Sequence, residues 1–173
     1  MQEGEPEEHV FPADGGPVRT RYRLAEGKLD GELLQYDEQE RLAARLTYRA
    51  GVMHGPAEFY EAGKLQMRTH YENGVEQGER TLFVGDKPAM KGRCTNGKLE
   101  GEATWLWPAG GVQRTAHYVN GVLEGEAIEY DERGRITQRS TYHADKLEGE
   151  LLMYGPNGKV RQNLMFKAGV QQK

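Results

Sequence analysis

The sequence predicts an all-β protein: an elongated, curved antiparallel meander of about six β-hairpin repeats, each 23–24 residues long. Each repeat holds two short segments rich in β-branched and aromatic residues, and the Asn-Gly pairs at 73–74, 96–97 and 120–121 separate such segments. A fixed period identifies a repeat architecture, and Asn-Gly between such segments is a strong signal for a hairpin. The period is set by a glycine that recurs at Gly31, Gly55, Gly78, Gly101, Gly125 and Gly149.

Each repeat contains a predicted two-residue turn. Asn73-Gly74 is an example, and such pairs suit a turn whose two central residues have positive φ angles. A turn of this size makes Tyr71 face Glu76 and, further along, Arg68 face Glu79. The sequence therefore predicts a ladder of opposite charges, either as a solvated face or as a stripe that a partner recognises. The same rule pairs Arg21 with Glu32, Lys91 with Glu102 and Arg139 with Glu150.

The strands that precede the turns are predicted to have one apolar face. Leu42, Ala44, Leu46 and Tyr48 alternate with other residues, so the two-residue period of a strand puts them on one side. The recurring glycine falls on this side as well, and a glycine within a strand marks a place where another group packs closely. We expect this face to hold a modest core. Some aromatic surface should stay available to a partner, because a single sheet cannot bury both faces.

The first residues differ in composition from the repeats. Residues 1–14 include four glutamates, which is typical of a flexible, solvated leader. The repeats occupy nearly all of the remainder. We therefore expect a single repeat domain over residues 15–173.

Composition excludes several classes of protein. The 173 residues have a net charge of −4, with 23 basic and 27 acidic residues intermixed, so no basic stripe is offered to nucleic acid. No apolar run approaches the roughly 18 residues that a membrane-spanning helix needs. The single cysteine, Cys94, excludes a disulfide within the chain, and we expect it to fill the site of the tyrosine found in other repeats. We expect a cytoplasmic protein, with the periplasm as the alternative if an export signal has been removed.

The sequence offers no arrangement that indicates catalysis, a cofactor or a metal. Ser140 is the one serine and lacks the glycines of a nucleophile elbow. His70 and His117 occupy corresponding places two repeats apart, about 19 Å at the usual strand spacing, which is too far to share a metal ion. We therefore expect a protein that is not an enzyme, with no catalytic residues, no cofactor and no metal.

Candidates for partner binding come from aromatic positions, from the charge ladder and from breaks in the repeat. In the segment TWLWPAGG, Trp105 and Trp107 flank Leu106, which replaces the tyrosine of other repeats. Exposed tryptophan is a favoured anchor at protein interfaces. Trp107 is the better interface candidate, because Trp105 is equally expected to fill the space that Cys94 leaves. The candidate contact residues are Trp105, Trp107, Tyr60, Tyr130, Glu79 and Glu102.

The repeat pattern resembles a known family. Read as Y-x-N-G-x-x-x-G-E-x-x-x-(x)-Y, it is similar to the MORN repeat variant of bacterial proteins, and its six copies cover nearly the whole chain. Ordinary MORN repeats have a further glycine two residues after the recurring one. That place here holds Leu33, Ala57, Arg80, Ala103, Ala127 or Leu151, which favours the variant.

The resemblance implies a non-enzymatic sheet that holds other molecules, and bacterial members are often labelled antitoxins. We therefore expect a protein-binding scaffold, and above all an antitoxin or immunity protein whose partner is a cognate toxin. The alternatives are a membrane-associated scaffold and a structural module of a larger assembly. Net negative charge disfavours anionic lipid. We expect no nucleic-acid partner, and a monomer or weak self-association through the terminal edge strands.

Overall fold

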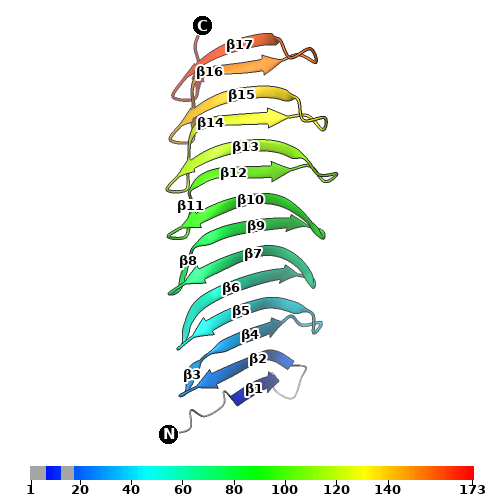
Figure 1. Ribbon diagram of the computed structural model, residues 1–173, viewed down its shortest axis with the longest axis vertical. Helices are drawn as coiled ribbons and strands as arrows, with labels where there is room; N and C mark the ends of the chain where they lie inside the picture. Colours follow the sequence, from blue (N-terminus) through cyan, green and yellow to red (C-terminus); the bar gives the residue numbers. More distant parts are fainter. Residues whose placement is uncertain (1–6, 13–17) are drawn as a thin grey trace. The chain divides into compact units, whose positions relative to one another are not determined.

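The computed structural model describes residues 7–12 and 18–173, and every regular element among them is a β-strand (Figure 1). Contacts group the chain into two compact units, one that ends at Asp86 and one that begins at Lys87. Within each unit successive strands pair as an antiparallel meander. The predicted all-β meander is therefore confirmed. The repeats that the sequence places in one domain over residues 15–173 are divided between two units.

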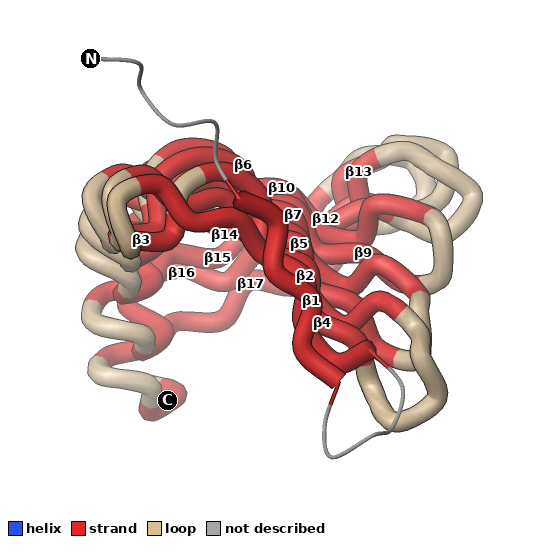
Figure 2. Tube along the Cα trace, turned by 90° about the horizontal axis from the view of Figure 1, so that it is seen from below, coloured by secondary structure: helices blue, strands red, loops and turns tan. Residues whose placement is uncertain are grey.

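In unit 2 the two-residue turns gather at one margin of the sheet and the longer loops at the other (Figures 1 and 2). In unit 1 the two-residue turn at Ala62-Gly63 lies at the same margin as the longer loop 37–41. The strands of unit 1 are β1 (Glu7–Pro12), β2 (Val18–Ala25), β3 (Lys28–Leu29), β4 (Gly31–Tyr36), β5 (Leu42–Arg49), β6 (Val52–Glu61), β7 (Lys64–Glu72), β8 (Val75–Glu76) and β9 (Gly78–Val84). The strands of unit 2 are β10 (Lys87–Thr95), β11 (Lys98–Leu99), β12 (Gly101–Leu106), β13 (Val112–Val119), β14 (Val122–Tyr130), β15 (Ile136–His143), β16 (Lys146–Tyr154), β17 (Val160–Lys167) and β18 (Val170–Gln171).

Part of the segment expected to be a flexible leader is a strand. Residues 7–12 form β1, which pairs antiparallel with β2, and His9 lies opposite Tyr22. The rings of His9 and Phe11 stack on Tyr22 at centroid distances of 5.4 and 5.8 Å. These contacts explain why an acidic segment joins the sheet. The rest of residues 1–14 lies outside the described residues.

The two-residue turns have the backbone that the Asn-Gly pairs predict. Asn73 and Gly74 have φ angles of 51° and 80°, and Asn120 and Gly121 have 53° and 82°. Positive φ at both central residues matches the right-handed twist of the strands that the turn joins. As predicted, Tyr71 faces Glu76 and Glu72 faces Val75 beside the turn.

Beyond the turn, the predicted register is wrong by two residues. Arg68 faces Thr81 and not Glu79, because the chain gains two residues at Gln77 and Gly78, where β8 ends and β9 begins. The recurring glycine causes the shift: Gly78 has a φ of 86°, which ordinary residues rarely adopt, and the strand bulges there. The other three predicted pairs fail in the same way: Arg21 faces Leu34, Lys91 faces Thr104 and Arg139 faces Leu152.

The arginines instead form ion pairs with other glutamates. Glu58 on β6 lies opposite both Arg45 on β5 and Arg68 on β7. Arg68 Nε is 2.8 Å and Arg45 Nη1 is 3.7 Å from the Glu58 carboxylate. Arg139 Nη1 is 3.4 Å from Glu126. A ladder of opposite charges therefore exists, but most of its partners differ from those that the turn rule gives.

Each unit has a small apolar core on the face predicted to carry it. In unit 1, Ala44 and Leu46 are buried with Leu33 and Ala57. In unit 2 the buried cluster is Ala116, Leu123 and Ala127. Partly buried aromatic residues pack against both clusters; in unit 2 these are Trp105, Tyr118 and Tyr142.

Neighbouring hairpins are linked at their turns by backbone and side-chain hydrogen bonds. Gly74 N donates to Met53 O and Gly121 N donates to Leu99 O, both at 2.8 Å. The residue before the recurring glycine adds a second bond, through a carboxylate that accepts the first N–H of the next turn. These bonds join Ala50 N to Asp30, Asn120 N to Glu100, Ala144 N to Glu124 and Ala168 N to Glu148, at 2.9, 2.7, 3.0 and 2.6 Å. They explain why an acidic residue recurs at this place.

Candidate functional site: an aromatic cleft in unit 2

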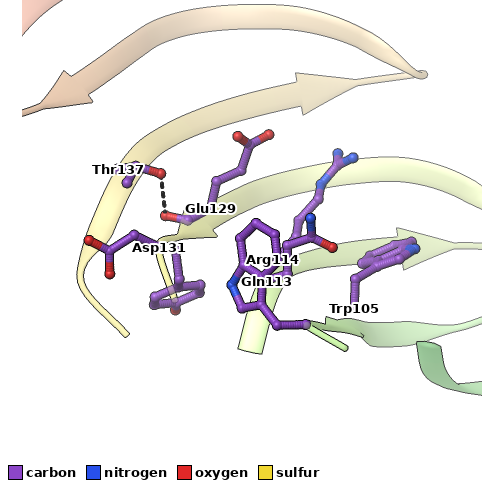
Figure 3. A pocket seen from close by; sticks show the side chains of 8 residues that line it. Trp105, Gln113, Arg114, Glu129, Asp131 and Thr137 are labelled. Carbon is purple, nitrogen blue, oxygen red and sulfur yellow. Dashed lines mark hydrogen bonds between the residues drawn. The ribbon is translucent and has the colours of Figure 1, made fainter. Parts of the chain in front are cut away.

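Three of the six candidate contact residues come together in unit 2. Trp105, Trp107 and Tyr130 line a cleft of about 540 Å³, and Figure 3 shows its lining side chains as sticks. Gln113, Arg114, Glu129, Asp131 and Thr137 complete the lining of this cleft, which we call the aromatic cleft.

A row of directly opposed residues forms the middle of the aromatic cleft. Arg114 on β13 faces Trp105 on β12 and, on its other side, Glu129 on β14. The Arg114 guanidinium lies over the Trp105 ring, 5.3 Å from its centroid, which is a cation–π contact. A bulge opposite Trp105 and Leu106 inserts Gln113, which also lines the cleft. In Figure 3 the Arg114 and Glu129 side chains project the same way from neighbouring strands.

Trp105 serves both the core and the aromatic cleft. Its ring is 6.3 Å from that of Tyr118, and it packs against the buried cluster of unit 2. It lies opposite Met90, whereas the fully buried Cys94 lies opposite Leu99. Packing against the core therefore accounts in part for a tryptophan at position 105.

Trp107 begins a loop whose backbone recurs elsewhere in the chain. Trp107 N donates to Gly111 O and Gly110 N donates to Trp107 O; the loops that begin at Asp37, Asp131 and Gly155 make the same two bonds. The Asp131 carboxylate also accepts bonds from the backbone N–H groups of Arg133 and Arg135, both at 2.9 Å. An indole has no acceptor for such amides. The loop therefore does not explain why a tryptophan is present.

The two aspartates of this loop type are committed to their own loops. The backbone N–H and guanidinium of Arg135 lower the pKa of Asp131 below its ordinary value, outweighing the effect of desolvation. Asp37 likewise has a lowered pKa: desolvation raises it, but the hydrogen bonds from the backbone and side chain of Arg41 prevail. Asp131 therefore lines the aromatic cleft as a carboxylate that is already paired with Arg135.

Two buried polar atoms of the cleft residues lack hydrogen-bond partners among the described residues. They are the Trp107 indole Nε1 and the Arg114 Nε. A buried N–H left without an acceptor destabilises a fold by about 1–3 kcal/mol. Two such groups in one cleft call for an explanation beyond folding.

The other three candidates lie elsewhere. Tyr60 is in unit 1, where its hydroxyl donates to Glu58 at 2.6 Å. Burial, followed by this bond, raises the pKa of Tyr60. The same bond and Arg68 lower the pKa of Glu58, although burial opposes them. Tyr60 is thus part of a cross-strand network. Glu79 and Glu102 are exposed, in different units, and do not line the aromatic cleft.

Sequence reasoning missed Arg114, Gln113 and Glu129, because their places on the sheet depend on the bulged register. A usable signal is a comparison of corresponding positions: the place that Trp107 occupies holds Asp37 and Asp131 in two other loops.

The same comparison of repeats reveals Glu76, a buried residue of unit 1 at a position where other repeats have an apolar residue such as Leu29 or Leu123. Glu76 accepts hydrogen bonds from Thr69 and Arg80.

Two further features bear on what the chain can bind. Within residues 7–12 and 18–173, no three His, Cys, Asp or Glu side chains gather as metal ligands. Nor does any part of these ranges form a helix of the length and apolar character required to cross a membrane.

Comparison with known proteins supports the resemblance seen in the repeats. Residues 53–73 and 147–168 match the family described as MORN repeat variant. No curated protein sequence matches the chain. The first match runs from β6 to the turn after β7, and the second covers most of β16 and β17, so each match contains one pair of strands and the loop between them. Such repeats commonly form scaffolds that bind proteins or membranes. One matched copy lies in each unit, so the chain is similar to the MORN repeat variant in both units.

Proposed function

We propose that this chain is a non-enzymatic scaffold that binds a protein partner through the aromatic cleft. The observation that carries the proposal is Trp107. Its loop makes the same backbone bonds as loops that begin with aspartate, so the loop does not require an indole. Its buried indole N–H has no partner among the described residues. Tryptophan is among the residues that contribute most to binding at protein interfaces.

We propose further that the partner is a bacterial toxin and that the chain acts as an antitoxin or immunity protein in the cytoplasm. Its repeats are of the type whose bacterial members are often labelled antitoxins. The net charge of −4 suits a basic toxin, because opposite charges speed association by electrostatic steering.

The test is protection of living cells. The product of the gene next to this one is expressed alone and together with the chain, and growth is followed. We expect the wild type to restore growth and to co-purify with the toxin in a fixed ratio. The Trp107→Ala variant should fail to protect. Tyr36→Ala is the matched control, because Tyr36 is a partly buried aromatic residue of unit 1 outside the cleft.

Three results would contradict the proposal. Failure of the wild type to bind or protect would remove the antitoxin role. Equal protection by both variants would show that the aromatic cleft is not the contact site. Flotation of the purified chain with vesicles, with no protein partner recovered, would favour a membrane-associated scaffold instead.

A further inference from the structure

We propose that the aromatic cleft receives a carboxylate: an aspartate or glutamate side chain of the partner, bound by the guanidinium of Arg114. This inference rests on the proposed function and specifies the partner group that the site recognises.

The first argument is the surplus of donors. Trp107 Nε1 and Arg114 Nε are both N–H donors, both buried, and both without an acceptor among the described residues. A ligand that supplies donors would leave them unsatisfied, whereas a ligand that supplies oxygen acceptors would satisfy them. Side-chain rotations at an interface are common on binding and suffice to turn these groups toward an arriving oxygen. A carboxylate offers two oxygens and matches the fork of an arginine.

The second argument is the state of the charges that line the aromatic cleft. Asp131 is engaged by Arg135, whose Nη2 lies 2.7 Å away, and by two amides of its own loop. Glu129 lies opposite Arg114, and its backbone carbonyl accepts a bond from Thr137 at 3.2 Å. Figure 3 places Asp131 and Trp105 at opposite ends of the view, with Arg114 and Glu129 between them. Glu129 is therefore the carboxylate of the chain that competes with a partner carboxylate for Arg114.

The opposite assignment is a lysine or arginine of the partner, held by Glu129 and the aromatic rings. It fits less well because the Arg114 guanidinium already lies over the Trp105 ring. A second cation at this ring would be placed beside the first, and like charges repel. The two assignments predict opposite effects of removing the charge of Glu129, which makes them separable.

The experiment uses the fluorescence of the intact protein. Trp105 and Trp107 are its two tryptophans, and both line the aromatic cleft. Capped peptides of the form Ala-Phe-X-Phe-Ala, with glutamate, glutamine or lysine at X, are titrated up to about 10 mM, which covers the millimolar affinities of small ligands. We expect a saturable change with the glutamate peptide, and affinity about tenfold weaker with the glutamine peptide, because charge-assisted hydrogen bonds are the stronger ones.

Two variants test the role of each charge. Arg114→Gln should remove the preference for glutamate over glutamine. Glu129→Gln should tighten binding of the glutamate peptide severalfold, because the competing carboxylate is lost. Gln162→Ala is the matched control, since Gln162 is an exposed, uncharged residue of unit 2 that does not line the aromatic cleft. Thermal unfolding of each variant checks the fold. If Arg114→Gln does not fold, the direction in which Glu129→Gln changes the affinity for the glutamate peptide still distinguishes a bound carboxylate from a bound cation.

The outcomes separate this inference from the proposed function. Weaker glutamate binding in Glu129→Gln, or a preference for the lysine peptide, overturns the carboxylate assignment. So does equal binding of the glutamate and glutamine peptides, or saturation by none of the three. If Trp107→Ala nevertheless loses the toxin, the protein-binding function stands and the carboxylate alone is wrong. If the glutamate preference holds but no toxin binds, the carboxylate site stands and the antitoxin role is wrong.

Discussion

Trp107 occupies the first position of a five-residue loop, 107–111, in which aspartate stabilises two other copies. In those copies the Asp37 and Asp131 carboxylates accept the N–H groups two and four residues later. The tryptophan cannot accept these bonds, and its indole N–H is buried with no partner among the described residues. Natural proteins depart from locally favourable choices mainly at functional sites. At this position the loop favours aspartate, whereas the binding site that we propose favours tryptophan.

Replacement of Trp107 by aspartate and by alanine should separate these two effects. Trp107→Asp should be more stable than Trp107→Ala by about 1 kcal/mol, because only the aspartate can accept the N–H groups of Ala109 and Gly111. Both variants should lose their affinity for the proposed toxin. Urea unfolding measures the difference in the free energy of unfolding. Equal stability of the two variants would show that an acceptor in this loop contributes nothing.

Only part of the aromatic cleft could be predicted from residue types. Trp105, Trp107 and Tyr130 stand out because large aromatic residues at breaks or at repeat positions are visible in the sequence itself. Arg114 and Glu129 are ordinary charged residues whose role comes from facing each other and Trp105 across three strands. Their alignment depends on where the bulge inserts Gln113, and residue type does not specify that.

At the scale of the hairpin, the recurring glycine has a structural role that no other residue fills equally well. Gly55 has a φ of 119°, and a Cβ at this position would lie 3.1 Å from both Cβ and Cγ2 of Thr47. Gly101 has a φ of 79° and no neighbour within 4 Å of such a Cβ. The two glycines therefore separate the effect of backbone conformation from that of close packing.

We expect Gly101→Ala to lower the free energy of unfolding by about 1 kcal/mol, the usual cost of a left-handed backbone for an ordinary residue. Gly55→Ala should cost more, about 2 kcal/mol or above, because the contact with Thr47 is added to the backbone strain. Chemical denaturation gives both values. Adding Thr47→Ser, which removes Cγ2 and keeps the hydroxyl, should restore part of the loss in Gly55→Ala. A double variant no more stable than the single one would exclude a cost from the contact with Cγ2 of Thr47.

The link between one hairpin and the next turn also predicts a dependence on pH. Glu124 accepts the Ala144 N–H, and one of its carboxylate oxygens lies 2.8 Å from His143 Nδ1. These two bonds lower the pKa of Glu124, so its contribution is present above the ordinary value of 4.5 and is lost as pH falls through the lowered value. The hydrogen bond to Glu124 raises the pKa of His143, so its contribution is complete below 6.5 and is lost as pH rises through the raised value.

The stability difference between the wild type and His143→Ala should therefore be largest between pH 4.5 and 6.5 and should shrink toward alkaline pH. Thermal unfolding of both proteins within this range and at alkaline pH measures it. Glu100 forms the equivalent bond to Asn120 N with no histidine beside the turn, so Glu100→Ala is the control for the acceptor alone. A difference for His143→Ala that does not vary with pH would contradict the ion pair.

The elements of the fold were largely predictable, and the register only in part. Period and turn chemistry are local properties, so the hairpins and the pairing beside each turn follow from them. The two residues gained at Gln77 and Gly78, the latter being the first residue of β9, change the partner of Arg68 from Glu79 to Thr81. A glycine accommodates both a regular strand and a bulge, so the sequence pattern does not distinguish them. The turn contacts made by Glu100 and Glu148 were missed for a related reason, since they join hairpins about 20 residues apart.

At the scale of the whole molecule, the two units contribute differently to the proposed function. Each has its own buried cluster and one matched MORN repeat, so the fold repeats. The aromatic cleft lies in unit 2, and both tryptophans belong to it. A net charge of −4 is a property of the entire chain and acts over a longer range than any single contact.

The charge predicts how association with a basic toxin responds to salt. Raising the salt concentration from about 50 to about 300 mM shortens the screening length about 2.4-fold, because this length varies as the inverse square root of ionic strength, and steering weakens accordingly. The association rate constant should therefore fall, while the dissociation rate constant changes little. Surface plasmon resonance measures both. A change confined to the dissociation rate would assign the salt effect to the bound interface and contradict steering.

The bonds that stack one turn on the previous hairpin also affect how the chain ages chemically. Asparagine followed by glycine tends to deamidate, in a reaction that starts when the glycine nitrogen attacks the asparagine side-chain carbonyl. In two of the turns that nitrogen is already engaged: Gly74 N donates to Met53 O and Gly121 N to Leu99 O. Ring closure must first break this bond, so the folded repeat protects Asn73 and Asn120 from conversion to aspartate and isoaspartate. The sequence pair that makes the turn easy to form is thus shielded from its own reactivity by the neighbouring repeat.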